Sequence, residues 1–311
     1  MVAVSDLSEQ RLASVRALYP AVKTTPCYQD MLLDPAIEAV AIATPVSSHF
    51  RLAMQALEAG KHVLVEKPMA LNSKQAALLV DEAERRNLVL MVDHTFVYHG
   101  SVRRIGELIA SGQVGKLRYF DSTRVNLGLF QRDVDVLWDL AVHDLSIMDF
   151  VIGKSPLAVA ATGMAHVPGQ PVNIAYLTCF FEDSLIAHIN VNWLSPVKIR
   201  RTLIGGDRQM IVYDDLEPSE KVKVYDSGIT VGDSPAGSDG PYERLVGYRT
   251  GDMWAPKVSL GEALSVEAQH FVDCIIKDAT PLTDGKVGLR VVRILEAATE
   301  SLRQGGCPVQ L

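Results

Sequence analysis

His62-Val63-Leu64-Val65-Glu66-Lys67-Pro68 is the stretch of sequence that decides the fold. Three consecutive apolar residues, two of them β-branched, are typical of a buried strand in a parallel sheet. Pro68 ends the strand because it cannot donate to a strand ladder. Ligands bind at the carboxyl ends of strands in open α/β sheets, so Lys67 is a candidate for proton transfer there. A solvated lysine at a strand end is the simpler interpretation, and the rest of the chain has to decide between the two.

The bulk composition narrows the class of protein. The chain has 311 residues, which suggests about two domains, and 48% of them are hydrophobic, as in ordinary globular proteins. A net charge of -7 provides no basic surface for nucleic acid. Four widely spaced cysteines without a C-x-x-C pair favour reduced thiols in a cytoplasmic protein. We see no leader segment and no apolar run of bilayer length, so we expect no membrane partner.

The first third of the chain alternates between strands and helices. We predict buried or edge strands over residues 2–5, 25–28, 39–43, 62–67 and 89–92, a helical turn over 30–33, and helices over 8–18, 49–59 and about 73–86. Such alternation predicts a doubly wound parallel sheet with right-handed crossovers. We therefore assign residues 1–95 to a Rossmann-like, nucleotide-binding domain.

Asp6 follows the first predicted strand. An acidic residue there can accept a hydrogen bond from the 2′-hydroxyl of NAD, and it would repel the 2′-phosphate of NADP. The alternative for Asp6 is an ordinary aspartate at a helix start. NAD is thus the favoured cofactor, and NADP is less favoured.

The glycine-rich turn of a dinucleotide fold has no place before Asp6. Such a fold begins with a strand and a G-x-G-x-x-G turn about 20 residues ahead of the acidic residue. In the strand order 3-2-1-4-5-6 the missing strand would lie between the strands at 2–5 and 39–43. We therefore expect an incomplete sheet, in a chain that represents a truncated or mis-started version of a longer protein; the less favoured alternative is a natural variant that fills the gap in another way.

The pattern changes from about residue 96. Helices are expected over 102–111, 138–151, 264–277 and 285–303, with strands over 116–125, 158–163, 173–181, 184–192, 198–205 and 209–213. Consecutive strands without intervening helices predict a mostly antiparallel sheet in an α+β domain over residues 96–311, and the family resemblance described below implies that this sheet is open-faced. Residues 225–255, rich in Gly, Asp and Ser, are predicted to form a long loop and are a candidate interface arm.

Asp139 and His143 are four residues apart on a predicted helix, so their side chains share a face. If that face meets the strand that ends at Lys67, the set suits oxidation of a secondary alcohol. His143 would take the hydroxyl proton, Lys67 would hydrogen-bond the same oxygen, and Asp139 would orient His143 or bind another hydroxyl. The alternative for His143 is a helix histidine paired with Asp139 or Asp144. His94, His99 and His143 lack metal-ligand spacing, so we expect no metal site.

Three motifs together resemble the glucose-fructose oxidoreductase / inositol dehydrogenase / MocA (Gfo/Idh/MocA) family. They are Val-Glu-Lys-Pro after a strand, Ala-Thr-Pro-x-x-x-His at 43–49 and Asp-x-x-x-His at 139–143. The resemblance implies an NAD(P)-dependent oxidoreductase of sugars, inositols or nucleotide sugars, and a homo-oligomer built through the C-terminal sheet. It implies Lys67 as the catalytic lysine, His143 as acid and base, and Asp139 as a substrate-binding acid. It also places Thr44, Pro45, His49 and Glu66 beside the cofactor.

Within the family, Asn126-Leu127-Gly128, Trp138-Asp139-Leu140 and the segment 192–198 most resemble members that act on nucleotide sugars. Asn126, Lys198 and Arg200 are then candidate substrate-binding residues. Lys198 and Arg200 share a strand face and could meet a diphosphate, or they could simply protect a strand edge from aggregation. A rival interpretation of the whole chain is a non-catalytic, cofactor-deficient relative that keeps the fold as an oligomerisation module.

Overall fold

The computed structural model describes residues 1–128, 134–231 and 246–311. The chain divides into two compact units, Met1–Asp93 with Gln269–Leu289, and His94–Ala268 with Arg290–Leu311. Sequence analysis placed residues 269–289 in the second domain, whereas in the structure they belong to the first compact unit. Thr283 explains why, because its Oγ1 donates to the carbonyl of Val92 at 2.8 Å and its own carbonyl accepts from the Val92 amide.

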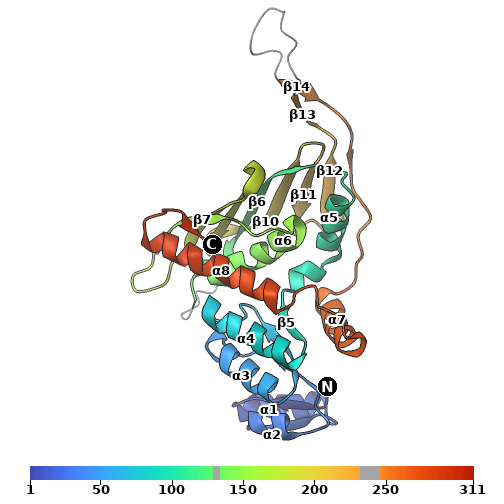
Figure 1. Cartoon of the computed structure of the whole chain (residues 1–311), viewed down its shortest axis with the longest axis vertical. Helices are drawn as coiled ribbons and strands as arrows, with labels where there is room; N and C mark the ends of the chain where they lie inside the picture. Colours follow the sequence, from blue (N-terminus) through green and yellow to red (C-terminus); the bar gives the residue numbers. More distant parts are fainter. Residues whose placement is uncertain (129–133, 232–245) are drawn as a thin grey trace, which may run out of the picture. The chain divides into compact units, whose positions relative to one another are not determined.

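The first unit has the alternating pattern that we predicted (Figure 1). Its elements are β1 (Ala3–Ser5), α1 (Glu9–Leu18), β2 (Lys23–Thr25), α2 (Tyr28–Leu33), β3 (Ala39–Ile42), α3 (Val46–Glu58), β4 (His62–Glu66), α4 (Ser73–Arg86) and β5 (Leu90–Asp93). All strand pairs in it are parallel, in the orders β1-β2 and β3-β4-β5. Among the described residues β1 pairs only with β2, and β3 only with β4.

Local chemistry accounts for these boundaries. Val63 and Val65 are fully buried in β4, as the apolar run required. The side chain of Ser8 caps α1 through the Arg11 amide, and Asn72 caps α4 through the Gln75 amide. The predicted strand over 25–28 was placed too late in the chain, because β2 ends at Thr25 and Tyr28 already begins α2.

The second unit is built on a nine-stranded sheet in the order β15-β12-β11-β10-β6-β9-β8-β7-β16. Its strands are β6 (Leu117–Leu127), β7 (Ala158–Met164), β8 (Ile174–Phe180), β9 (Ile186–Asn192), β10 (Leu194–Gly206), β11 (Met210–Asp214), β12 (Val222–Tyr225), β15 (Met253–Trp254) and β16 (Val309–Gln310). Every pair is antiparallel except β6 with β9, so the prediction of a mostly antiparallel sheet is confirmed.

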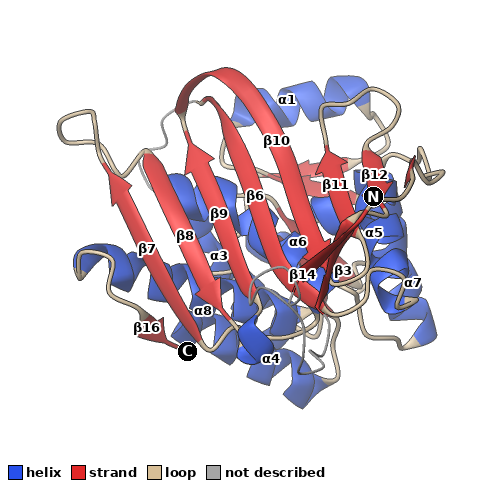
Figure 2. Cartoon of the chain, turned by 90° about the horizontal axis from the view of Figure 1, so that it is seen from above, coloured by secondary structure: helices blue, strands red, loops and turns tan. Residues whose placement is uncertain are grey.

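Helices α5 (Gly100–Ala110), α6 (Val142–Ile152) and α8 (Gly285–Arg303) lie on one face of this sheet (Figure 2). Buried residues of these helices, such as Ile105, Leu145 and Leu295, pack with strand residues such as Phe120 and Ile189 in one core. Tyr176, Phe180 and Ile186 remain exposed on the strands. The sheet is therefore open-faced, as predicted.

Two parts of the second unit differ from the sequence prediction. The predicted helix over 138–151 begins instead with a π-helical turn, Leu137–Ala141, before α6. The predicted loop over 225–255 contains a β-hairpin, β13 (Gly228–Val231) with β14 (Val246–Arg249), together with β15. Residues 232–245 of that segment lie outside the described residues. Helix α7 (Ala263–Lys277) agrees with its predicted range to within one residue.

Candidate active site

Lys67 directly follows β4, and the backbone around it is fixed by its neighbours. Its amide donates to Glu66 Oε2 at 3.0 Å, and the Lys67-Pro68 peptide bond is cis. The Pro68 carbonyl lies 2.9 Å from Nδ1 of His49. The turn that carries the candidate catalytic lysine is thus held from two sides.

Glu66 lies beside Asp93, because the last residues of the parallel strands β4 and β5 are register partners. Burial, the charge of Asp93 and a hydrogen bond between the two carboxyl groups together raise the pKa of Glu66 to about 7, with burial the largest cause, while Lys67 opposes the shift. A hydrogen bond between two carboxyl groups requires a proton. The pair therefore holds a shared proton near neutral pH, directly before the lysine.

His49 joins the β3–α3 turn to the turn after β4. Its ring is 1% exposed, with Nε2 2.7 Å from the Thr44 carbonyl and Nδ1 facing the Pro68 carbonyl. Thr44 Oγ1 and Ser48 Oγ are also within hydrogen-bond distance, at 2.6 Å. His49 thus fixes the positions of Thr44 and Pro45, which are predicted to lie beside the cofactor. A direct contact between His49 and a cofactor stays a prediction.

Asp6 lies just after β1 and is held at the start of α1. Its Oδ1 accepts from the Ser8 amide at 2.7 Å and its Oδ2 from Arg11 at 3.3 Å. The bond from the Ser8 amide is the largest cause that lowers the pKa of Asp6. The ionised side chain is favoured, and an ionised carboxylate acts only as a hydrogen-bond acceptor, which suits a ribose hydroxyl.

In the second unit, Asp139 lies in the π-helical turn and His143 in the first turn of α6. Asp139 Oδ2 accepts from the indole of buried Trp193 at 3.1 Å. The His143 ring meets the edge of Phe96, with ring centroids 5.0 Å apart. π-Helical turns occur frequently at functional sites. Lys67 lies in the first unit and His143 in the second, so their convergence on one substrate stays a prediction.

Asp144, the residue after His143, forms a buried ion pair that was not predicted from the sequence. Arg124 of β6 donates to Asp144 at 2.6 and 3.2 Å, and both side chains are almost completely buried, at 4% and 2% exposed. Ser122 also donates to Asp144, at 2.7 Å. The Arg124 guanidinium lies 4.4 Å from the centre of the Phe96 ring, which also contacts His143. Polar residues at alternate positions of a strand were the available signal for Ser122 and Arg124.

The three candidate substrate-binding residues lie in different surroundings. Arg200 pairs with Arg124 in the strand register, donates to Asp215 at 3.3 Å and lies 5.7 Å from the Phe96 ring. Lys198 is exposed, in a part of β10 where the register with β6 shifts. Asn126 is half-buried near the end of β6. Arg200 thus lies near the Phe96 ring that contacts His143, whereas Lys198 lies in an exposed part of the strand.

Both units match models of one protein family. Residues 1–94 match the model described as an oxidoreductase family with an NAD-binding Rossmann fold, and residues 102–212 match the GFO/IDH/MocA C-terminal domain. The chain belongs to the GFO/IDH/MocA oxidoreductase family. The resemblance deduced from the three sequence motifs is therefore confirmed, and so are the α/β fold class and the NAD-binding character of the first unit.

Relatives of this GFO/IDH/MocA protein are named as dehydrogenases and reductases. The UDP-N-acetylglucosamine 3-dehydrogenase of Acidithiobacillus ferrooxidans is 28% identical over 94% of this chain and 86% of its own length. The dTDP-3,4-didehydro-2,6-dideoxy-alpha-D-glucose 3-reductase of Saccharopolyspora spinosa is 34% identical over 60% of this chain and 58% of its own. The scyllo-inositol 2-dehydrogenase (NADP(+)) of Bacillus subtilis is 24% identical over 97% and 87%.

Solved structures of family proteins share the fold. The Acidithiobacillus ferrooxidans dehydrogenase has a TM-score of 0.82 at 25% identity and covers 98% of this chain and 90% of its own. A levoglucosan dehydrogenase in complex with NADH and levoglucosan also has a TM-score of 0.82, at 20% identity, over 99% and 89% of the two chains. At that level of identity the second likeness concerns the fold alone.

The residues present fit two parts of a bound NAD. Asp6 offers an ionised carboxylate after β1 for the adenosine ribose. Thr44 follows β3, Glu66 ends β4 and Lys67 follows it. The sequence contains no G-x-G-x-x-G motif for the pyrophosphate. In the described parts of the chain, no helix is long and apolar enough to cross a membrane, and no group of three potential metal ligands comes together.

Proposed function

We propose that this protein is an NAD-dependent dehydrogenase that transfers hydride between nicotinamide and a secondary alcohol of a sugar, an inositol or a nucleotide sugar. The observation that carries the proposal is family membership in both units together with Lys67 at the carboxyl end of β4. Among the substrate classes, the 28% identical UDP-N-acetylglucosamine dehydrogenase favours a nucleotide sugar. The relatives are named as enzymes, and nothing among them favours the non-catalytic alternative.

In the proposed mechanism, bound NAD supplies the hydride acceptor. His143 takes the proton of the substrate hydroxyl, and Lys67 donates a hydrogen bond to the same oxygen as negative charge develops on it. Asp139, held by the Trp193 indole, orients His143 or binds a second hydroxyl. Arg124 and Asp144 support this arrangement because they fix the start of α6 against β6.

Cofactor and substrate contacts complete the proposal. Asp6 selects NAD over NADP, because an ionised carboxylate repels a 2′-phosphate. Thr44, Pro45, His49 and Glu66 line or support the nicotinamide side, and Asn126, Lys198 and Arg200 contact the substrate. We also propose a cytoplasmic location, as the separate cysteines suggest, and a homo-oligomer formed through the exposed sheet face that carries Tyr176, Phe180 and Ile186.

The proposed activity is tested by mixing the protein with NAD⁺ and a panel of nucleotide sugars, inositols and free sugars, and following NADH by absorbance. We expect reduction of NAD⁺ with at least one member of the panel, and a lower rate with NADP⁺. Failure across the panel in both directions, with NAD binding intact by fluorescence, would refute the substrate class. Sedimentation velocity of the wild type and Tyr176→Glu tests the oligomer, which should dissociate in the variant.

A further inference from the structure

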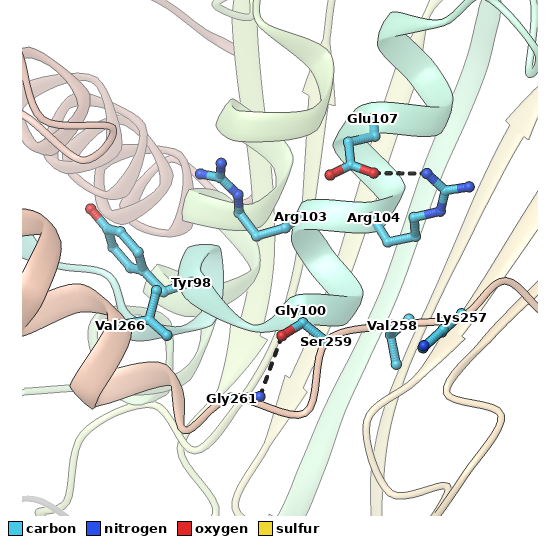
Figure 3. Close-up of a pocket in the computed structure, with 10 residues that line it drawn as sticks. All are labelled: Tyr98, Gly100, Arg103, Arg104, Glu107, Lys257, Val258, Ser259, Gly261 and Val266. Atoms are coloured by element: carbon cyan, nitrogen blue, oxygen red, sulfur yellow. Dashed lines mark hydrogen bonds and ion pairs between the residues drawn. The ribbon is translucent and has the colours of Figure 1, made fainter.

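A pocket of about 340 Å³ lies between the first turns of α5 and the extended segment 257–261, which leads toward α7 (Figure 3). The segment passes directly against the start of α5. A Cβ atom on Gly100 would lie 2.1 Å from the carbonyl oxygen of Ser259, so glycine is needed at this position. All residues that line the pocket belong to the second unit.

The charged residues that line the pocket are mostly cations. They are Arg103, Arg104, Lys257 and one acid, Glu107. Arg104 pairs with Glu107 at 2.7 Å, as the dashed line in Figure 3 shows. The Arg103 guanidinium lies 5.7 Å from the centre of the Phe150 ring. Within the described residues, neither Arg103 nor Lys257 has a carboxylate partner. Two cations that lack such a partner thus line one pocket, in a chain whose formal net charge is -7.

The hydrogen-bonding groups at the pocket are mostly donors. Helix α5 has 11 residues and begins at Gly100, which lines the pocket, so the positive end of the helix dipole lies at the pocket. Nε of Arg104 is buried without an acceptor in the described part of the chain. Ser259 Oγ accepts from the Gly261 amide at 3.5 Å and keeps its own proton to donate. A pocket with mostly donors is suited to bind an anion.

We propose that this pocket binds a diphosphate group. Guanidinium and ammonium groups together are the usual protein ligands of phosphate oxygens, and a diphosphate carries enough charge to engage both Arg103 and Lys257. The cavity volume is within the range of small-ligand sites and exceeds what one small carboxylate requires. Tyr98, Val258 and Val266 line the same pocket and offer an apolar wall to the group that the diphosphate carries. The proposal concerns binding and does not depend on the proposed catalytic activity.

The test is calorimetric titration of the 311-residue protein with inorganic pyrophosphate at low ionic strength. We expect saturable binding that weakens as salt is added, because the contacts are ionic and partly exposed. The double variant Arg103→Gln/Lys257→Gln should raise the Kd at least about tenfold, or about 1.4 kcal/mol. Gly100→Ala should also weaken binding, because the added methyl group displaces the segment at Ser259.

The matched control is Arg118→Gln/Lys154→Gln, which removes two exposed, ion-paired cations from the same unit and should leave the Kd unchanged. Titrations with UDP and UMP identify the source of the diphosphate. Tighter binding of UDP than of pyrophosphate, lost in the double variant, indicates a nucleotide, and equal affinities indicate that the pocket recognises the diphosphate alone. Absence of pyrophosphate binding, an equal Kd in the Arg103/Lys257 variant, or equally tight binding of citrate would each overturn the proposal.

Discussion

Glu66 and Asp93 place two carboxyl groups and one proton beside Lys67. The arrangement follows from the sheet, because the last residues of neighbouring parallel strands end at the same edge. One negative charge on the pair still attracts the lysine ammonium, whereas two would hold it more firmly to the strand end. The protonation state of Glu66 thus affects how freely Lys67 can serve a substrate oxygen.

The raised pKa of Glu66 predicts a specific pH dependence of stability. The folded protein holds this proton up to a pH of about 7, whereas the ordinary pKa is 4.5. Its contribution to the free energy of unfolding is therefore complete below pH 4.5 and is lost as the pH rises to about 7. We expect the stability of the wild type to fall over that interval relative to Glu66→Gln, in urea titrations at a series of pH values. Identical pH dependence in both proteins would contradict the shared proton.

The variant Asp93→Asn tests the contribution of the second carboxyl group of this pair. Removing the charge of Asp93 removes a cause of the raised pKa of Glu66, so that pKa should fall, although burial keeps it above 4.5. Carboxyl-carbon NMR titration of the variant measures the shift. A pKa of Glu66 that stays near 7 in Asp93→Asn would mean that burial alone accounts for it.

Lys67 and His143 are predicted to carry the chemistry, each through an interaction with the reacting oxygen. Lys67→Ala and His143→Ala should each lower kcat by about 10²-fold or more, with a smaller effect on the KM of the alcohol. Lys74→Ala, which removes an exposed lysine of α4, is the control and should retain wild-type kcat. Steady-state kinetics with the substrate found in the panel gives both constants. Wild-type rates in either site variant would remove that residue from the mechanism.

At the scale of secondary structure, the Arg124–Asp144 pair joins β6 to the first turn of α6. Burial of Asp144 is tolerated because Arg124 and Ser122 both donate to it. The Phe96 ring lies between this pair and the His143 ring, so a change at Arg124 reaches His143 through one aromatic contact.

Arg124→Met should destabilise the protein by about 3–5 kcal/mol, because it leaves the Asp144 carboxylate buried without its main partner. The double variant Arg124→Met/Asp144→Leu removes both charges and should recover much of that loss. Urea denaturation followed by circular dichroism measures both. An equal loss in the single and double variants would show that packing, and not the unpaired charge, causes the effect.

Sequence periodicity was sufficient for most of the secondary structure. The strand that begins at residue 62 and the helix predicted over about 73–86 were located to within one residue, because the apolar patterns that mark them are local properties. The π-helical turn before α6 was not, because its amphipathic pattern differs little from that of an α-helix. The hairpin of β13 and β14 was missed because each strand has only four residues and the two stand in a segment otherwise rich in Gly, Asp and Ser.

Only part of the candidate site could be predicted from the sequence. Lys67, His143 and Asp139 stand in motifs with a chemical rationale, and their roles stay predictions. The surroundings depend on strand register, which sequence does not specify across distant segments. Arg200 meets Asp215 only because β10 and β11 are neighbours in the sheet, and Arg124 meets Asp144 only because α6 packs against β6.

At the scale of the whole molecule, the first unit uses a late segment of the chain. Thr283 is fully buried and bonds both backbone groups of the neighbouring Val92. Gly288 packs nearby, and a Cβ on it would lie 2.6 Å from a methyl group of Val92. Residues 269–289 are therefore part of the core of the first unit.

Thr283→Val should lower the free energy of unfolding by about 1–3 kcal/mol, because the isosteric side chain cannot donate to the buried Val92 carbonyl. Thr280→Val, three residues earlier and exposed, is the control and should change stability by less than about 0.5 kcal/mol. Thermal and urea unfolding measure both, and hydrogen exchange at Val92 reports the local effect. Equal stability of Thr283→Val and the wild type would contradict the role of residues 269–289.

The central strand β6 also affects how the chain can fold during synthesis. β6 begins at Leu117, but its neighbours β9 and β10 begin only at Ile186 and Leu194. A nascent polypeptide that has emerged only as far as β8 therefore exposes both hydrogen-bonding edges of its longest early strand. Such edges pair readily with other chains. If a chaperone binds the nascent chain until β10 has left the ribosome, the yield of native protein should rise. Translation in a cell-free system with and without the chaperone measures this yield.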